Sequence, residues 1–375
     1  MTTFITRLPD TDNGSGPRLA VKDLIDVKGV PTTAGSRAIA ETAQPAEQDA
    51  TCLAGARAAG AVIVGKANLH ELAYGGAGIN EWFGTPVNPL DPALLPGGSS
   101  SGSAVAVAVG EADVAYGSDT GGSVRIPSAF CGTTGLKTTY GRVSLDGVWP
   151  LAPSLDTVGP MARDVAGVAA GMALLEPGFR IAAAPSGRIG RIRPTGFEVD
   201  PVVDAAVDAA LARSGLELAE VELPGWLEAR ETCSVILDYE AAQSNQALMA
   251  DPVVRALIGP NVLARLTAAQ TVTQQAVAAA RAAQPAWQSA MAAALQAAGG
   301  LLALPTVPFL PPPLTAAPGL HFTAFTNPVN LTGFPALAIP VPSGGRLPAS
   351  VQLIGPPGSE DLLLATGAVI EAAIA

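Results

Sequence analysis

Two glycine–serine clusters stand close together in the first third of the chain, and each lies directly beside an apolar segment. The first reads PGGSSSGSAVAVAVG (residues 96–110) and the second reads GSDTGGSVRIPSAFCG (residues 117–132). A flexible linker is excluded because apolar, periodic sequence flanks both clusters closely. A phosphate-binding loop is excluded because neither cluster supplies the lysine that such a loop needs at a fixed spacing. The clusters therefore predict a backbone shaped to present a serine hydroxyl and its neighbouring N–H groups.

The segments around these clusters alternate between strand-like and helix-like patterns. Residues 18–21 (RLAV) and 61–65 (AVIVG) are predicted strands, and residues 48–60 between them have helical spacing that ends at a glycine. Residues 100–109 are a predicted small-residue helix, followed by a strand at 112–116. This alternation predicts an α/β layer architecture.

The rest of the chain continues the pattern around a helix-rich middle. The predicted elements are a strand from about Arg188, a helix at 201–213, a strand at 216–221, helices through the Ala-rich residues 228–299 with a break at Pro285, strands at 336–341 and 350–354, and a helix at 360–373. We find no internal repeat or linker. We expect one domain over residues 1–375, with the chemical motifs at 18–170, a variable helix-rich part at 176–300, and a C-terminal sheet and helix at 300–375.

Composition and charge exclude several kinds of partner. The chain has 375 residues, of which 49% are hydrophobic, and a formal net charge of −11. This balance disfavours nucleic acid or an anionic membrane as the main partner. The densest basic run, Arg188, Arg191 and Arg193, is predicted to be a solvated strand face. The longest uncharged stretch, from Ala282 past Leu320, is interrupted by glycines and prolines, so no membrane helix is predicted.

The cysteines and the N-terminal residues indicate the compartment. Cys52, Cys131 and Cys233 are odd in number and lie far apart, which is typical of reduced, buried thiols. The segment MTTFITRLPDTDNG lacks the basic-then-apolar pattern of a signal peptide. We therefore expect a cytoplasmic protein.

One candidate nucleophile is Ser100, because residues 98–102 match the G-x-S-x-G pattern of the nucleophile elbow. That elbow needs a strand directly before it, and the three prolines of NPLDPALLP disfavour a strand there. It also needs a histidine downstream, and only His321 qualifies, in the loop-like segment PGLHF, since His70 lies upstream. We therefore disfavour the elbow.

A serine can instead be activated by a neutral lysine amine, a role that arginine cannot fill because it stays protonated. Only four lysines occur among the 21 Lys and Arg residues: Lys22, Lys28, Lys66 and Lys137. Lys22 and Lys66 both leave apolar strands, where burial would lower the amine pKa. The residues alone leave the choice between these two open.

Five ordered segments of the chain resemble the amidase signature family. They are LAVKDLIDVKGVPTTAGS, PGGSSSGSAVAVA, GSDTGGSVRIPSAFCGTTGLKTTYGRVS, PLAPSLDTVGPMARDV and FTNPVNLTGFPALAIP…LPASVQLIGPPGSEDLLL, covering roughly residues 18–170 and 300–375. The resemblance implies an α/β fold: a single α/β/α sandwich domain with a large mixed, mainly parallel central sheet. The chain departs from the family at Ser101, where glycine is common, and at Thr138, where proline is common.

The resemblance also implies a Ser–cis-Ser–Lys triad. Its nucleophile is Ser123 in DTGGSVRIP, and its bridging serine, entered through a cis peptide bond, is Ser99. Its lysine is Lys22 of the segment VKD, rather than Lys66. The implied oxyanion hole consists of the backbone N–H groups of Thr120, Gly121, Gly122 and Ser123. Asp119 and Arg125, which flank the nucleophile, are expected to form a structural ion pair.

The reaction implied is hydrolysis of a small-molecule carboxamide through an acyl-enzyme, which releases a carboxylate and ammonia or an amine without a cofactor or metal. The same triad would serve a carbamate, aryl-amide or ester hydrolase. A glutaminase-type subunit of a tRNA-dependent amidotransferase is the alternative that acts only in a complex, and a homodimer is left open. The expected substrate-binding residues are Tyr74, Gly75, Gly76, Trp82, Trp149 and Phe325.

Overall fold

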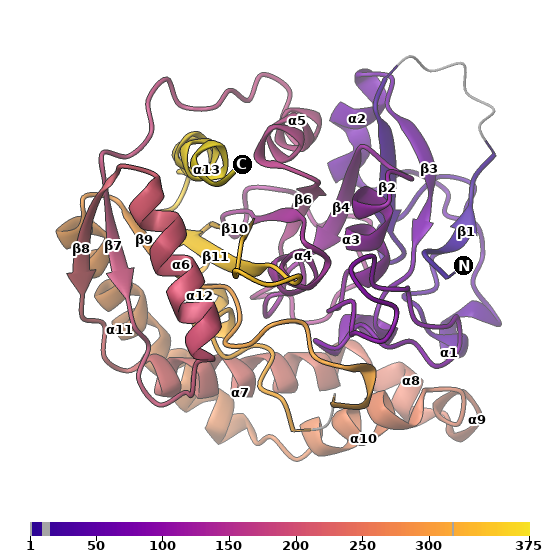
Figure 1. Ribbon diagram of the computed structural model, residues 1–375. Helices are drawn as coiled ribbons and strands as arrows, with labels where there is room; N and C mark the ends of the chain where they lie inside the picture. Colours follow the sequence, from indigo (N-terminus) through magenta and orange to yellow (C-terminus); the bar gives the residue numbers. More distant parts are fainter. Residues whose placement is uncertain (1, 10–15, 317–318) are drawn as a thin grey trace.

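A central twisted sheet organises the protein, whose computed structural model describes residues 2–9, 16–316 and 319–375 (Figure 1). Within these residues the sheet has 11 strands in the order β1-β3-β2-β4-β6-β5-β10-β11-β9-β7-β8. The strands are β1 Phe4–Arg7, β2 Arg18–Lys22, β3 Val62–Ala67, β4 Val114–Ser118, β5 Thr134–Lys137, β6 Val158–Ala162, β7 Arg188–Ile192, β8 Glu217–Val221, β9 Leu301–Pro305, β10 Ala336–Val341 and β11 Ala349–Ile354.

Helices cover both faces of this sheet (Figure 1). They are α1 Arg37–Ala40, α2 Ala54–Ala58, α3 Ser101–Ala108, α4 Arg125–Cys131, α5 Val165–Leu175, α6 Pro201–Arg213, α7 Trp226–Ser244, α8 Gln246–Ala250, α9 Pro252–Arg255, α10 Pro260–Ala269, α11 Gln274–Ala298, α12 Asn327–Thr332 and α13 Glu360–Ile374. Three 3₁₀ turns lie at Thr51–Leu53, Glu71–Ala73 and Leu314–Ala316.

The alternation of side chains along a central strand shows why both layers are needed. In β9, Leu301 and Ala303 pack in the same apolar cluster as α6 and α13. Leu302 and Leu304, one residue along in each case, belong to the cluster that contains α7 and α11. Since successive strand side chains point to opposite faces, this fully apolar strand requires helices on both sides. The predicted α/β/α sandwich with a large mixed sheet is confirmed.

The balance of strand directions differs from the prediction of a mainly parallel sheet. Among the described residues, six strand pairings are antiparallel and four are parallel. The centre of the sheet is antiparallel because β5 and β6 lie on either side of a connection without a crossover helix, and β10 and β11 are joined by the short segment 342–348. Such connections reverse the chain direction, whereas parallel neighbours require a crossover.

Two expectations about the second half of the chain are wrong in detail. Pro285 does not break the helical segment, because it lies inside α11. An internal proline costs about 3 kcal/mol, which the burial of Trp287 and Met291 in the same helix can offset. Arg191 is not solvated either: its side chain is buried and forms ion pairs with Asp204 and Asp208 of α6.

Other expectations from composition agree with the fold. Cys52, Cys131 and Cys233 are free and buried, and burial raises the pKa of each thiol. No helix in the described part of the chain is both long enough and apolar enough to cross a bilayer.

The parallel strands β3, β2 and β4 bring the residues with chemical potential to one edge of the sheet. Lys66, Lys22 and Ser118 each lie at or next to the carboxyl end of their strand. In the register, Val21 lies opposite Tyr116, so Lys22 and Ser118 become neighbours. Carboxyl ends of parallel strands are the usual place for a site in an open α/β sheet.

Candidate active site

Lys22 lies at the centre of a buried group of hydroxyls. Its Nζ is 2.7 Å from Ser99 Oγ and 2.8 Å from Ser118 Oγ, within hydrogen-bonding distance of both. The Gly98–Ser99 peptide bond is cis, as the resemblance implied. Ser118 was not predicted, and its position directly after the buried strand β4 is the only sequence signal that points to it.

Burial changes the acid–base chemistry of this amine. Lys22 has no exposed surface, and desolvation lowers its pKa from 10.5 to about 7, although Asp119 and Asp156 act in the opposite direction. A substantial fraction of the amine is therefore unprotonated near neutral pH. A neutral amine can accept a proton, which is what a general base requires.

The structure distinguishes between the two lysines that the residues alone left open. Lys66 Nζ lies 3.0 Å from Asp23 Oδ1 and donates a hydrogen bond to Thr32 Oγ1 at 2.7 Å. Both members of this ion pair are fully buried. Lys66 is therefore held by a carboxylate, whereas Lys22 contacts serines.

Ser123 lies in the loop between β4 and α4, next to the cluster that contains Ser99. The backbone N–H of Ser100 donates to the carbonyl oxygen of Ser123 at 3.2 Å, which joins the two glycine–serine segments. Ser123 keeps 8% of its surface exposed, whereas Ser99 and Ser100 have none. The Ser100 hydroxyl donates instead to the carbonyl of Ser118 at 3.3 Å, which does not suit a nucleophile.

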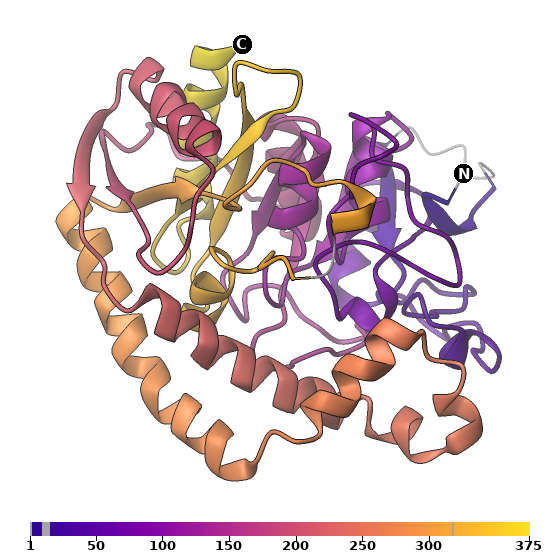
Figure 2. The same ribbon diagram turned by 60° about the horizontal axis from the view of Figure 1, so that its bottom comes forward.

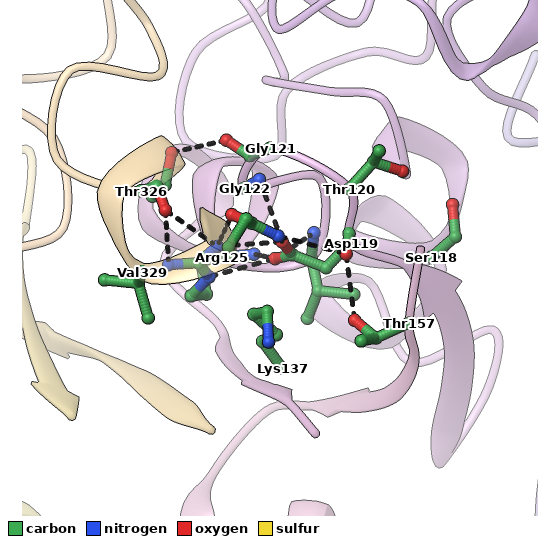
Figure 3. Close-up of polar contacts among 12 residues, drawn as sticks. Ser118, Asp119, Thr120, Gly121, Gly122, Arg125, Lys137, Thr157, Thr326 and Val329 are labelled. Atoms are coloured by element: carbon green, nitrogen blue, oxygen red, sulfur yellow. Dashed lines mark hydrogen bonds and ion pairs between the residues drawn. The ribbon is translucent and has the colours of Figure 1, made fainter. Parts of the chain in front are cut away.

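Asp119 and Arg125 hold the Ser123 loop in place (Figure 3). They form the expected ion pair, with Nη2 2.8 Å from Oδ1, and both side chains are fully buried. Asp119 also accepts hydrogen bonds from the backbone N–H groups of Gly122 (2.8 Å) and Val124 (3.1 Å). Burial disfavours this carboxylate, but Arg125 outweighs that effect and holds the Asp119 pKa well below its usual range. The pair stays charged and braces the loop.

Residues from the C-terminal part of the chain complete this brace. Thr326 Oγ1 donates to the carbonyl of Gly121 at 2.6 Å, as Figure 3 shows. Arg125 donates to Asn330 Oδ1 and to Gln352 Oε1, both at 2.5 Å. The loop is therefore fixed by segments some 200 residues apart in the chain, which no local motif could reveal.

The backbone N–H groups predicted to form an oxyanion hole are not equivalent. Gly122 donates its N–H to Asp119, so it is already occupied. Within the described residues, the N–H groups of Thr120, Gly121 and Ser123 have no protein acceptor within hydrogen-bonding distance. Gly122 still requires glycine, because its φ is +124° and an added Cβ would lie 2.3 Å from Thr326 Oγ1. The available donors are thus three, and Gly122 positions them.

A cavity of about 640 Å³ opens beside these loops. Its lining residues are His70, Gly75, Gly76, Ala77, Ile79, Arg230, Asn261, Arg265, Leu314, Thr315, Leu320, His321, Phe322 and Thr323. Two hydrogen bonds connect the cavity wall to the cis peptide segment: His70 N–H to the Ser99 carbonyl (3.0 Å) and Gly98 N–H to the Gly76 carbonyl (2.8 Å). The cavity therefore adjoins the Lys22–Ser99 group.

The predicted substrate-binding residues fall into two sets. Gly75 and Gly76 line the cavity. Tyr74 lies behind it, with its hydroxyl donating to Asp238 at 2.5 Å. The prediction is wrong for the other aromatic residues in this cavity, because they lie elsewhere: Trp82 is an exposed residue near Arg37, Trp149 lines a different hollow, and Phe325 is fully buried.

Several residues at this site went unpredicted. Arg230 and Arg265 come from α7 and α10, which carry no recognisable motif. Lys137 is fully buried beside the Asp119–Arg125 pair, donates to the carbonyls of Thr138 and Phe334, and has its pKa lowered to about 7 chiefly by burial. In the described part of the chain, no group of three or more His, Cys, Asp or Glu side chains is arranged to hold a metal ion.

Comparison with known proteins agrees with this geometry. A family model described as Amidase matches residues 16–177 and 180–364. A glutamyl-tRNA(Gln) amidotransferase subunit from Thermus thermophilus is 36% identical over 411 residues, covering 96% of this chain and 85% of that protein. The 2-amino-5-chloromuconic acid deaminase of Comamonas testosteroni is also 36% identical, over 403 residues that cover 96% of this chain and 82% of that enzyme. A solved amidase structure has a TM-score of 0.85 and 33% identity, with 96% and 85% of the two chains covered.

The fold and the site thus define a hydrolase that acts on amide C–N bonds. The chain belongs to the amidase family and carries the amidase signature.

Proposed function

We propose that this protein hydrolyses a small-molecule carboxamide through an acyl-enzyme, with Ser123 as nucleophile, Ser99 as proton relay and Lys22 as base. The observation that carries the proposal is the contact between Lys22 Nζ and Ser99 Oγ at 2.7 Å, made by a buried amine whose pKa is about 7. Ser123 is the partly exposed serine beside this pair. An amine that is neutral at physiological pH needs no histidine to activate a hydroxyl.

The acylation step follows from these positions. Ser123 Oγ attacks the amide carbonyl carbon and passes its proton to Ser99 Oγ, whose own proton passes to Lys22 Nζ. The tetrahedral oxyanion receives hydrogen bonds from the free N–H groups of Thr120, Gly121 and Ser123, each worth about 3 kcal/mol in an oxyanion hole.

The relay then runs in reverse. The C–N bond breaks as Ser99 donates a proton to the departing nitrogen, and the ammonium of Lys22 restores the Ser99 hydroxyl. Water then attacks the ester of Ser123 by the same relay and releases the carboxylate. Ser118 Oγ, 2.8 Å from Lys22 Nζ, orients the amine throughout.

A panel of amides, anilides, carbamates and esters tests this proposal with the purified chain. We expect Ser123→Ala to lower kcat/KM by about four orders of magnitude or more, because nucleophile and base act as a unit. Ser100→Ala is the matched control and should retain activity, since the Ser100 hydroxyl is directed at the carbonyl of Ser118.

Labelling provides an independent measurement of the nucleophile. After treatment with a serine-directed phosphonylating reagent, mass spectrometry should locate the tag on Ser123. A tag found reproducibly on Ser100, with Ser123 unmodified, would refute the assignment. So would an active Ser123→Ala variant together with an inactive His321→Ala variant, because that result indicates a histidine-dependent elbow.

A second candidate is a glutaminase subunit of a tRNA-dependent amidotransferase. It is favoured by the relatives so named in Thermus thermophilus and Halobacterium salinarum, the latter 32% identical with 99% of both chains covered. This alternative predicts that the purified chain is inactive alone and binds partner subunits stably. Hydrolysis of free carboxamides by the isolated chain at ordinary enzymatic rates would favour the first candidate.

A further inference from the structure

The cavity beside the proposed triad contains a guanidinium without a counterion. Arg230 of α7 lines the cavity, and its Nη2 lies 3.2 Å from His321 Nδ1. No carboxylate of the described residues forms an ion pair with Arg230. Its Nε is buried and lacks a hydrogen-bond acceptor in the same set of residues. A buried donor left without an acceptor costs about 1 to 3 kcal/mol, so the structure leaves this position open for a ligand atom.

The second arginine of the cavity is in a different situation. Arg265 of α10 lies 3.7 Å from Asp238 Oδ1, stacks over the Tyr74 ring at 3.9 Å, and donates to the Tyr74 carbonyl at 3.0 Å. Its charge is therefore partly balanced and its orientation is fixed by the protein. Arg230 has neither a carboxylate nor a ring partner among the residues that the structure describes.

The remaining polar groups of the cavity do not balance this charge. No acidic side chain occurs among the lining residues of the described chain. His70 is neutral, because burial, Arg265 and Lys22 lower its pKa to about 3. His321 Nδ1 must accept the hydrogen bond from Arg230, since a guanidinium only donates, so a neutral His321 carries its proton on Nε2. The cavity thus has an excess of positive charge and of hydrogen-bond donors.

We propose that Arg230 binds a carboxylate of the substrate, so that the preferred substrates are amides that also carry a carboxylate. This inference rests on the proposed function, because it names the substrate class of the same site. A carboxylate accepts two parallel N–H bonds from a guanidinium, which would occupy the free donors of Arg230. Ile79, Leu320 and Phe322 provide an apolar wall for the carbon chain between the carboxylate and the amide.

The activity test compares pairs of substrates that differ in charge alone. Monoamides of dicarboxylic acids, such as glutaramic acid, are measured against neutral amides of equal chain length, such as pentanamide. We expect Arg230→Met to lower kcat/KM for the anionic amide by about ten- to a hundredfold, the range for a hydrogen bond to a charged group, and to leave the neutral amide nearly unchanged. Arg230→Lys should recover part of the loss. Arg255→Met, in the exposed helix α9 and outside the cavity, is the matched control.

A binding measurement separates this inference from the proposed function. Calorimetry with glutarate, which cannot be hydrolysed, should show binding to the wild type and to Ser123→Ala, and at least tenfold weaker binding to Arg230→Met. Should no amide be turned over while glutarate still binds through Arg230, the proposed function fails and the carboxylate site stands. Should neutral and anionic amides be hydrolysed alike by the wild type and by Arg230→Met, the carboxylate site fails and the function stands. If Arg230→Met does not fold, Arg230→Gln is measured in its place.

Discussion

Replacing Lys22 with methionine should abolish amide hydrolysis and at the same time make the folded protein more stable near neutral pH. Lys22 is fully buried, and burial lowers its pKa from 10.5 to about 7. That difference corresponds to roughly 5 kcal/mol of unfavourable free energy for the protonated amine in the folded state. Methionine has a similar length and carries no charge, so it removes this cost together with the base.

The pH dependence of stability follows from the same values. Between pH 7 and 10.5 the unfolded chain protonates Lys22 while the folded chain does not, so the unfolded state binds more protons. The free energy of unfolding should therefore rise with pH in this window, by up to about 1.4 kcal/mol per pH unit. Relative to Lys22→Met, the wild type should gain roughly 2 to 3 kcal/mol between pH 7 and pH 9. Urea unfolding of both proteins at the two pH values measures this gain.

The rate should follow the same titration. The kcat/KM of the wild type should be nearly constant above pH 8 and fall about tenfold for each unit below pH 6, because the ammonium form of Lys22 cannot accept a proton. Lys66→Met is the matched control. It removes the other strand-end lysine and leaves Asp23 buried without its partner, so it should destabilise the protein by about 3 to 5 kcal/mol.

Three results would refute this reasoning. The first is a Lys22→Met variant whose kcat/KM is within tenfold of the wild type. The second is a wild-type pH–rate profile that stays flat from pH 5.5 to 8. The third is a difference in unfolding free energy between wild type and Lys22→Met that does not change from pH 7 to pH 9.

Two further substitutions test the brace of the nucleophile loop. Gly122→Ala should lower kcat by orders of magnitude, because its φ of +124° and the contact of a Cβ with Thr326 would displace the neighbouring N–H donors; Gly187→Ala, with nothing within 4 Å of the added Cβ, should behave like the wild type in the same assay. Asp119→Asn should reduce the urea-unfolding free energy by about 3 to 5 kcal/mol, because it leaves Arg125 buried without its carboxylate, and a loss below 1 kcal/mol would contradict that role.

Short-range features of the sequence were sufficient to predict the order of the elements and the catalytic motifs. The helix at 201–213 and the strand at 336–341 were predicted with the bounds that the structure shows, because each has clear periodicity and clear ends. The two glycine–serine clusters indicated a serine-bearing loop, since their composition allows close approach of the backbone. These features are local, and local backbone preferences act wherever the chain finally lies.

Other features depend on residues that meet only when the sheet has assembled. Lys22 and Lys66 are equivalent in the sequence, and they differ because one ends beside Ser99 and the other beside Asp23. The engagement of the Gly122 N–H by Asp119 likewise depends on the loop as folded.

The cavity was the least predictable part of the molecule. Its wall combines segments near residue 75, α7, α10 and the stretch from Leu314 to Thr323, which Figure 2 shows converging on one side of the sheet. Helical periodicity in α7 and α10 identifies a face to be buried and does not tell which side chain at its margin reaches a pocket. The sequence therefore determined the chemistry of the nucleophile loop, while tertiary packing decided the protonation of Lys22 and the surroundings of Arg230, because burial and charge balance depend on every neighbour that the fold supplies.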